Sequence, residues 1–193
     1  MLLKNIFDLL AAILLLPFLA PLILILILIA TIDTGQFGLF SQTRIGKHAK
    51  PFSIYKIRTM KGNQESDITT KKTHEITKTG NFIRHTKLDE LPQIINVLLG
   101  QMSFVGPRPD VTGYADQLRD EDRLILKVKP GITGPAQLKF RNEEELLNKQ
   151  DDPKKFNDEV LWPEKVKINL DYVKNRTFIA DMKYLWNTVF NTN

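Results

Sequence analysis

Two adjacent acids, Asp89 and Glu90, are the residues of this chain whose types and spacing most directly suggest chemistry. They precede Pro92 and an apolar run that ends at Gly100. If Asp89 is the N-cap of a helix, Pro92 falls at the third helical position, where its missing N–H breaks no intrahelical bond. A carboxylate at a helix N-terminus is kept ionised by the macrodipole, which suits a nucleophile or a metal ligand. A purely stabilising cap is the alternative.

Arg108 follows this helix and lies between Pro107 and Pro109. Proline fixes its own backbone and pushes the preceding residue to extended geometry, so the arginine is held stiffly. A stiff guanidinium is well suited to bidentate contact with phosphate oxygens. The stretch therefore combines candidate carboxylate chemistry with a candidate phosphate-binding cation.

Composition narrows the class of protein. A length of 193 residues allows one core of ordinary size plus an anchor. The lack of cysteine excludes disulfides and thiolate metal sites. The formal charge of +5 predicts an anionic partner: a phosphorylated substrate, acidic lipid or nucleic acid. Nucleic acid is the weakest of these, because the chain has neither an arginine-rich tail nor a zinc-finger or RNA-binding motif.

The charge-free run from 9 to 32 is long enough to reach across a bilayer. Pro17 and Pro21 lie one turn apart near its middle, where each removes a backbone bond and kinks the axis. The two arms on either side are each too short to span alone. We therefore predict a hairpin-like membrane helix with both ends cytoplasmic; a straight span is the alternative.

A basic segment follows the apolar run. No acid occurs between Asp33 and Glu65, whereas six cations do: Arg44, Lys47, Lys50, Lys56, Arg58 and Lys61. Positive residues beside a membrane segment stay on the cytoplasmic side, so the globular part is predicted to be cytoplasmic. The same cations can hold anionic lipid headgroups.

Residues 52–60 are predicted to form a strand, with Lys56 and Arg58 on one face. Two cations on one face usually indicate solvent exposure. Residues 61–80 are polar and lack periodicity, which predicts a mobile loop.

Two further helices are predicted, over 114–128 and 178–190. The first contains the triplet from Asp120 to Asp122, a D-x-D pattern that binds a metal and a nucleotide diphosphate in some glycosyltransferases but is more often a solvated helix face. The second carries an apolar stripe that fits either a core helix or one lying in the headgroup layer. No role follows for the acidic stretch 143–152.

The run from Leu88 to Pro109, with LDELPQ, NVL, G, MS and VGPRP, resembles the catalytic core of the bacterial sugar transferase family, the monotopic phosphoglycosyl transferases. The family pattern F-x-x-x-K-x-R-T-M is also met, from Phe52 to Met60. The resemblance covers about residues 6–137. It implies transfer of a sugar-1-phosphate from a nucleotide diphosphate sugar to polyprenol phosphate, with a UDP-sugar and undecaprenyl phosphate as the expected pair.

The resemblance also implies an architecture: an α/β fold, mostly helical with a small sheet. A re-entrant membrane helix (1–33) would precede a small cytoplasmic catalytic domain (34–193) with interfacial amphipathic helices. The expected location is the cytoplasmic face of the bacterial inner membrane. The family helix bends at a Ser-Pro pair, which is Ala20-Pro21 here, so the hydroxyl that bonds a freed carbonyl is missing.

Site roles are implied in the same way. Asp89 would be the nucleophile that forms a phosphosugar-aspartate and releases a nucleoside monophosphate, and Glu90 would assist it. Both acids would hold Mg²⁺. The candidates for binding phosphate and substrate are Lys56, Arg58, Arg84, Arg108, Arg123, Thr133 and Gln137.

The expected partners are the nucleotide sugar, polyprenol phosphate and membrane lipids, and not nucleic acid. A homodimer is possible. The sequence does not identify the transferred sugar or the base of the nucleotide. One alternative is a peripheral membrane glycosyltransferase that uses the D-x-D triplet. The other is a non-enzymatic basic membrane adaptor whose acids are only helix caps.

Overall fold

The computed structural model describes residues 2–62 and 76–190. Most of the predicted loop 61–80, from 63 to 75, lies outside the described residues. The chain forms two compact units, one with residues 1–43 and 53–100 and the other with residues 44–52 and 101–193.

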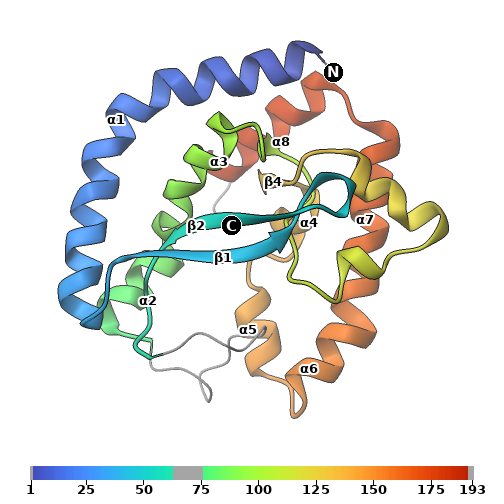
Figure 1. Ribbon diagram of the computed structural model, residues 1–193. Helices are drawn as coiled ribbons and strands as arrows, with labels where there is room; N and C mark the ends of the chain where they lie inside the picture. The colour runs from blue at the N-terminus through green and yellow to red at the C-terminus, as the bar shows by residue number, and fades with distance from the viewer. Residues whose placement is uncertain (1, 63–75, 191–193) are drawn as a thin grey trace. The chain divides into compact units, whose positions relative to one another are not determined.

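The first unit begins with one long helix, α1 (Leu2–Thr34), which continues through Pro17 and Pro21. Figure 1 shows that α1 bends part-way along its length, as expected where prolines interrupt the hydrogen-bond ladder. Its length of 33 residues and the mean hydropathy of 3.1 over an 18-residue window make it long and apolar enough to cross a membrane. The re-entrant path stays a prediction.

Strands β1 (Leu39–Ile45) and β2 (Pro51–Ile57) pair in a two-stranded sheet and are joined by the 3₁₀ turn η1 (Lys47–Ala49). The predicted strand 52–60 therefore ends early, at Ile57. The Arg58 N–H still donates to the Gly38 carbonyl, at 2.7 Å. Figure 1 shows the two paired strands.

Helix α2 (Lys78–His85) follows the undescribed segment. The Thr77 hydroxyl oxygen caps it by accepting from the Gly80 N–H at 2.8 Å. The predicted loop thus extended too far at its C-terminal end, because residues 78–80 already form the first helical turn.

The acid pair lies in a 3₁₀ helix, η2 (Leu88–Gln93), which continues into α3 (Ile94–Leu98). The N-cap is Lys87, in the left-handed region with φ of 58°. The expectation that Asp89 is an N-cap was wrong, because it lies inside the first turn. Pro92 has no N–H to donate to the Leu88 carbonyl, so the α-type ladder starts only after it.

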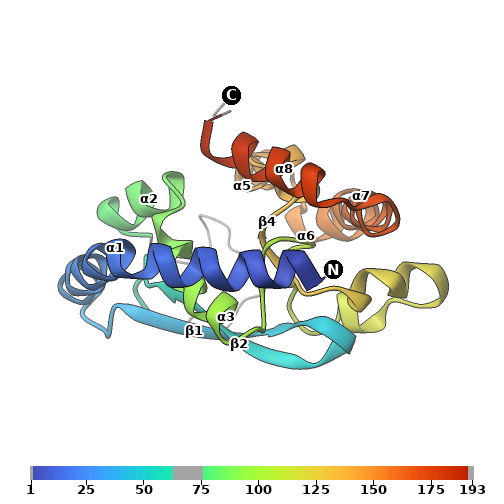
Figure 2. The same cartoon turned by 90° about the horizontal axis from the view of Figure 1, so that it is seen from above.

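Asn96 joins α3 to β2 inside the first unit. This fully buried amide donates from Nδ2 to the Ser53 carbonyl at 2.7 Å, and its Oδ1 accepts from the Tyr55 N–H at 3.2 Å. Ile54 and Ile94 are both buried, each only 2% exposed. Helix α3 packs on α1, as both views show (Figures 1 and 2).

The second unit is built around two short parallel strands, β3 (Ser103–Val105) and β4 (Gly131–Thr133). In their register Ser103 lies opposite Gly131 and Val105 opposite Thr133. The remaining elements are η3 (Ala115–Gln117), η4 (Asp120–Lys127), α4 (Pro135–Lys139), α5 (Glu143–Asn148), α6 (Pro153–Phe156), the π-helical turn η5 (Asn157–Leu161), α7 (Trp162–Asn175) and α8 (Phe178–Phe190).

The helix predicted over 114–128 was wrong. Two 3₁₀ helices, η3 and η4, occupy this stretch, separated by extended backbone at Leu118 and Arg119. Asp120 then adopts a φ of +46°, which a continuous helix does not allow. Apolar periodicity showed which residues turn inward but not the type of turn.

The predicted helix 178–190 was confirmed as α8. Its side chains Ile179, Trp186, Val189 and Phe190 are exposed by 60 to 69%. The fold class was confirmed at the coarse level: the described residues are mostly helical, and their strands form two small sheets.

Gly106 and Gly131 let the β3 and β4 segments approach closely. The Gly106 N–H donates to the Thr133 carbonyl at 2.9 Å, and the Gly131 N–H donates to the Pro107 carbonyl at 2.8 Å. A Cβ on Gly131 would lie 2.1 Å from the Gly106 nitrogen. Both N–H groups are therefore hydrogen-bonded to backbone carbonyls within the second unit. The role of the two glycines is to let these backbone segments pack closely.

We expect Gly131→Ala to destabilise the protein by at least about 2 kcal/mol, because the added methyl group meets backbone that cannot move aside. Thermal unfolding in detergent checks this. Gly113→Ala, where a Cβ meets no atom within 4 Å but φ is +99°, measures the cost of backbone strain alone. An equal or smaller loss for Gly131→Ala would contradict the packing role.

Candidate active site

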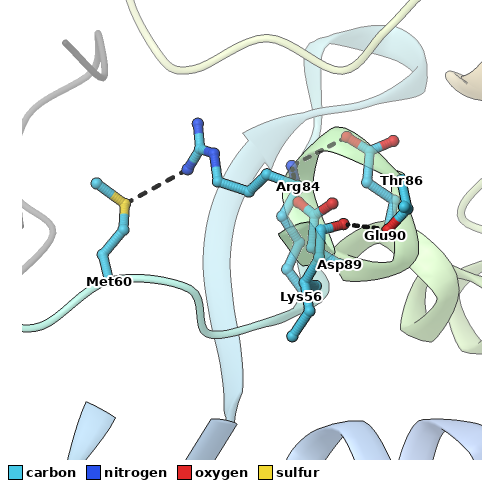
Figure 3. Close-up of polar contacts among 7 residues, drawn as sticks. Lys56, Met60, Arg84, Thr86, Asp89 and Glu90 are labelled. Carbon is cyan, nitrogen blue, oxygen red and sulfur yellow. Dashed lines mark hydrogen bonds and ion pairs between the residues drawn. The ribbon is translucent and has the colours of Figure 1, made fainter. Parts of the chain in front are cut away.

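Three charged side chains meet in the first unit: Lys56 from β2, and Asp89 and Glu90 from η2 (Figure 3). The Lys56 ammonium lies 3.2 Å from Glu90 Oε1 and 4.0 Å from Asp89 Oδ2. Both acids are only 8% exposed. The lysine therefore makes its closer ion pair with Glu90 and its more distant one with Asp89.

Asp89 Oδ1 is buried and accepts no hydrogen bond from any residue that the structure describes. Burial raises the pKa of Asp89 above its ordinary value of 3.8. The Lys56 charge opposes this rise in pKa, and the neighbouring Glu90 adds to it. A poorly solvated carboxylate with one uncommitted oxygen can attack an electrophile or bind a cation.

Arg84 brings a second cation toward Asp89. Its Nη1 lies 3.4 Å from the Met60 sulfur, as Figure 3 shows. Thioether sulfur is a weak acceptor, so this contact orients the guanidinium without neutralising it. The Arg84 charge lowers the pKa of Asp89, as does that of Lys87, although burial outweighs both.

Arg58, the other cation of the F-x-x-x-K-x-R-T-M pattern, is engaged elsewhere. Its Nε donates to the Phe37 carbonyl at 3.0 Å, and its guanidinium lies 5.2 Å from the centre of the Phe40 ring. Among the described residues, no ion pair links Arg58 to Asp89 or Glu90.

The other four predicted binding residues belong to the second unit. Arg123 is exposed and donates to the Leu118 carbonyl at 3.2 Å. The Thr133 hydroxyl lies 2.7 Å from that of Thr188. Gln137 donates to the Gly106 carbonyl at 3.3 Å, while its Oε1 is buried without a described partner. Arg108 lines a pocket. Their roles stay predictions.

The D-x-D triplet forms the first turn of η4. All three of its acids are exposed, and Glu121 pairs with Lys174 at 2.8 Å. No group of three or more potential His, Asp or Glu ligands occurs in the part of the chain that the structure describes. The triplet therefore fits a solvated helix face.

Asp89 and Glu90 fit a magnesium site in their chemistry. Mg²⁺ binds through one or two carboxylates, and waters and substrate phosphates complete the shell. The uncommitted Asp89 Oδ1 is a hard oxygen ligand of this kind. Magnesium stays a prediction.

Asn96, which holds α3 on β2 beside Lys56, was not predicted as a site residue, because it carries no charge. One signal was present: Asn96 is the only polar residue in the apolar run from Ile94 to Leu99. A lone amide inside a buried run needs partners for its polar groups.

Comparison with known proteins shows the family. Residues 1–192 match the family described as "Bacterial sugar transferase". The chain belongs to the bacterial sugar transferase family. It is therefore an enzyme of the transferase class, which disfavours the adaptor alternative.

Named relatives in this family include an uncharacterized sugar transferase, EpsL, of Bacillus subtilis, which is 39% identical over 98% of this chain and 86% of the relative. The UDP-glucose:undecaprenyl-phosphate glucose-1-phosphate transferase of Escherichia coli is 37% identical over 98% of this chain and 40% of the relative. The undecaprenyl-phosphate galactose phosphotransferase of Salmonella typhimurium is 35% identical over 96% of this chain and 39% of the relative. The chain thus spans about four-tenths of the length of the last two sugar transferases.

We expect Asp89→Asn to raise the melting temperature of this sugar transferase at pH 7.5. An ionised carboxylate whose folded pKa is raised costs stability above that pKa, and the cost vanishes below the unfolded value of 3.8. The gain should therefore shrink as the pH falls toward 4. Thermal unfolding across this range, without added metal, measures it.

Glu90→Gln is the matched control. It leaves the Lys56 ammonium without its 3.2 Å partner and should destabilise the protein by about 1–3 kcal/mol. A lower melting temperature for Asp89→Asn at pH 7.5 would show that the Asp89 carboxylate is stabilised by its surroundings in the folded protein.

Proposed function

We propose that this chain transfers a sugar-1-phosphate from a UDP-sugar to undecaprenyl phosphate through a covalent phosphosugar-aspartate. The observation that carries the proposal is the buried carboxylate of Asp89, with one uncommitted oxygen next to the Lys56 cation. The printed names of the Escherichia coli and Salmonella relatives support the substrate pair.

In the first step, an Asp89 oxygen attacks the phosphorus that carries the sugar. The bond from that phosphorus to the oxygen bridging the two phosphates breaks, and the electron pair leaves with the nucleoside monophosphate. The product is an acyl phosphate that links Asp89 to the sugar phosphate. Burial favours this attack, because a carboxylate with a raised pKa is more basic.

In the second step, a phosphate oxygen of the polyprenol phosphate attacks the same phosphorus. The Asp89–phosphorus bond breaks, the carboxylate is restored, and the lipid leaves with a sugar diphosphate linkage. One side chain therefore serves in turn as nucleophile and leaving group.

Both steps bring anions together, so cations must offset the charge. Lys56, Arg84 and Lys87 are cations of the first unit whose charges act on Asp89. Glu90 holds Lys56 at 3.2 Å and so positions the ammonium beside the nucleophile. Magnesium, held by Asp89 with Glu90, would supply further neutralisation of phosphate charge when bound.

The membrane arrangement belongs to the same proposal. Helix α1 is the membrane element, with its bend at Pro17 and Pro21 and both ends cytoplasmic. The catalytic part would lie at the cytoplasmic face of the bacterial inner membrane, where the acceptor presents its phosphate. Leu14 and Phe18, exposed by 69 and 80%, support contact between α1 and lipid.

Product analysis tests the proposed reaction. The protein is incubated in lipid nanodiscs with undecaprenyl phosphate, Mg²⁺ and UDP-glucose or UDP-galactose labelled in the sugar. We expect a labelled lipid and release of UMP, with turnover reduced by more than about 10³-fold in Asp89→Asn. Release of UDP would instead indicate a glycosyltransferase, and an Asp89→Asn rate within about tenfold of wild type would rule out this nucleophile.

The acid limb of the pH profile tests the Lys56 charge. Lys56 lowers the pKa of Asp89, so Lys56→Met should raise the pKa of the acid pair and move the acid limb of kcat/KM to higher pH. The value of kcat/KM on the pH-independent plateau should also fall, by about 10²-fold.

Lys56→Arg, which keeps the charge, should leave the acid limb near its wild-type position while altering the plateau. An acid limb that stays in place in Lys56→Met, or moves to lower pH, would show that this ammonium does not control the nucleophile.

A further inference from the structure

One side-chain contact joins the end of α1 to the start of α2 inside the first unit. The Thr77 hydroxyl donates to Asp33 Oδ2, across 44 positions of the chain. Asp33 is the penultimate residue of α1, and the negative end of the helix dipole disfavours a carboxylate there. The contact with Thr77 therefore stabilises an acid that is poorly placed for its own helix. Figures 1 and 2 show α2 beside this end of α1.

The same hydroxyl is the N-cap of α2. Thr77 Oγ1 accepts from the Gly80 N–H at 2.8 Å while it donates to Asp33. The side chain is well enclosed, since Thr77 is only 8% exposed. A hydroxyl donates one hydrogen bond and accepts others, so the carboxylate fixes the direction of the O–H and leaves a lone pair for the cap. Asp33 thus orients the group that begins α2.

The backbone after β2 also contacts the start of α2. The Thr77 N–H donates to the Thr59 carbonyl at 3.3 Å, and Met60 pairs with Ile76 in an isolated antiparallel bridge. A Cβ on Gly80 would collide with the Thr59 carbonyl oxygen, so the first helical turn lies directly on this backbone. The start of α2 is therefore held both by α1 and by the segment that follows β2.

Arg84 lies on the face of α2 that these contacts hold. Thr77, Gly80 and Arg84 follow one another at spacings of three and four residues, which places them along one side of the helix. Gly80 meets Thr59, and one turn later Arg84 Nη1 lies 3.4 Å from the sulfur of Met60. The position from which the guanidinium extends is therefore set by where α2 begins.

The placement of Arg84 matters because its charge acts on Asp89. In the proposed reaction the phosphates of the nucleotide sugar come to the same carboxylate, and a cation near them offsets their charge. Catalysis of this kind is sensitive to geometry, and a displacement of about 1 Å can lower a rate by about 10²-fold. Residues that fix the start of α2 can therefore affect the reaction without touching the substrate.

We propose that Asp33 and Thr77 are positioning residues: through the N-cap of α2 they hold Arg84 where its guanidinium binds the phosphates of the nucleotide sugar. This inference rests on the proposed function and deepens it, because it gives the end of α1 a task in the reaction besides contact with lipid.

Thr77→Val tests the proposal, because valine has a similar shape and lacks the hydroxyl. Kinetics are measured on the full chain in nanodiscs with undecaprenyl phosphate, Mg²⁺ and labelled UDP-glucose or UDP-galactose. We expect KM for the nucleotide sugar to rise at least about fivefold and kcat to fall at least about tenfold, because a displaced Arg84 binds the phosphates less well in both the ground state and the transition state. A loss of folded protein alone would lower kcat and leave KM unchanged.

Asp33→Ala breaks the same contact from the other end and leaves the Thr77 cap in place. It should shift KM and kcat in the same directions, and it decides the proposal if Thr77→Val does not fold. Thr77→Ser keeps the hydroxyl and should restore both constants to within about twofold of wild type.

A double-mutant cycle with Arg84→Met separates positioning from bracing. Once Arg84 is absent, Thr77→Val has no cation to displace, so we expect it to change kcat/KM by less than about twofold in that background. A brace that only stabilises the fold would lower kcat/KM by the same factor with and without Arg84.

Thr177→Val is the matched control. The Thr177 hydroxyl accepts from the Ala180 N–H at 3.1 Å in the first turn of α8, so this variant loses a threonine cap of the same kind in the second unit. It should lower the melting temperature and leave KM for the nucleotide sugar unchanged.

Three outcomes would overturn the positioning role: an unchanged KM in folded Thr77→Val or Asp33→Ala, no rescue by Thr77→Ser, or an equal factor with and without Arg84. In each of these cases wild type still makes labelled lipid, so the transferase stands and only the role of Asp33 and Thr77 is removed. Failure of the proposed function looks different, because wild type itself would then make no labelled lipid from either UDP-sugar, and the positioning role would fall with it.

Discussion

The site depends on one constraint: two adjacent buried carboxylates share one close ammonium group. Lys56 cannot pair equally with both, and its distances of 3.2 Å to Glu90 and 4.0 Å to Asp89 show how the charge is divided. Glu90 takes the ion pair, whereas Asp89 keeps a buried oxygen without a described partner and a raised pKa. Asymmetry of this kind gives two chemically identical groups different tasks. One acid holds the cation in place, and the other stays available to react.

Local backbone features maintain this arrangement. Pro92 prevents a regular α-helical start, so the acids lie in a tight 3₁₀ turn that follows Lys87 in the left-handed region. Strain at such a residue persists only where the surrounding structure enforces it. Asn96 follows in α3, and its two hydrogen bonds fasten that helix to the strand that carries Lys56.

The sequence indicated which residues belong to the candidate site better than it indicated their geometry. The acidic pair Asp89 and Glu90 stood out from residue type and position, whereas Lys56 and Arg84 became candidates only through the family resemblance. The structure places all four residues in one unit. The type of turn could not be predicted, because apolar periodicity does not distinguish an α-helix from a 3₁₀ helix. The engagement of Arg58 with Phe37 and Phe40 depends on where β2 ends, which no local pattern encodes. Apolar periodicity predicted α8 correctly. The similar pattern over 114–128 missed the interruption at Asp120, because periodicity carries no information on a backbone φ of +46°.

Mapping of the covalent intermediate tests the central claim most directly. The protein would be incubated with UDP-glucose or UDP-galactose and Mg²⁺ in the absence of lipid acceptor, quenched in acid, digested and examined by mass spectrometry. The account predicts a hexose phosphate adduct on Asp89, formed together with one UMP per active site and lost on addition of undecaprenyl phosphate. An adduct on another residue, or lipid product formed by a protein that releases no UMP before the acceptor is added, would contradict it.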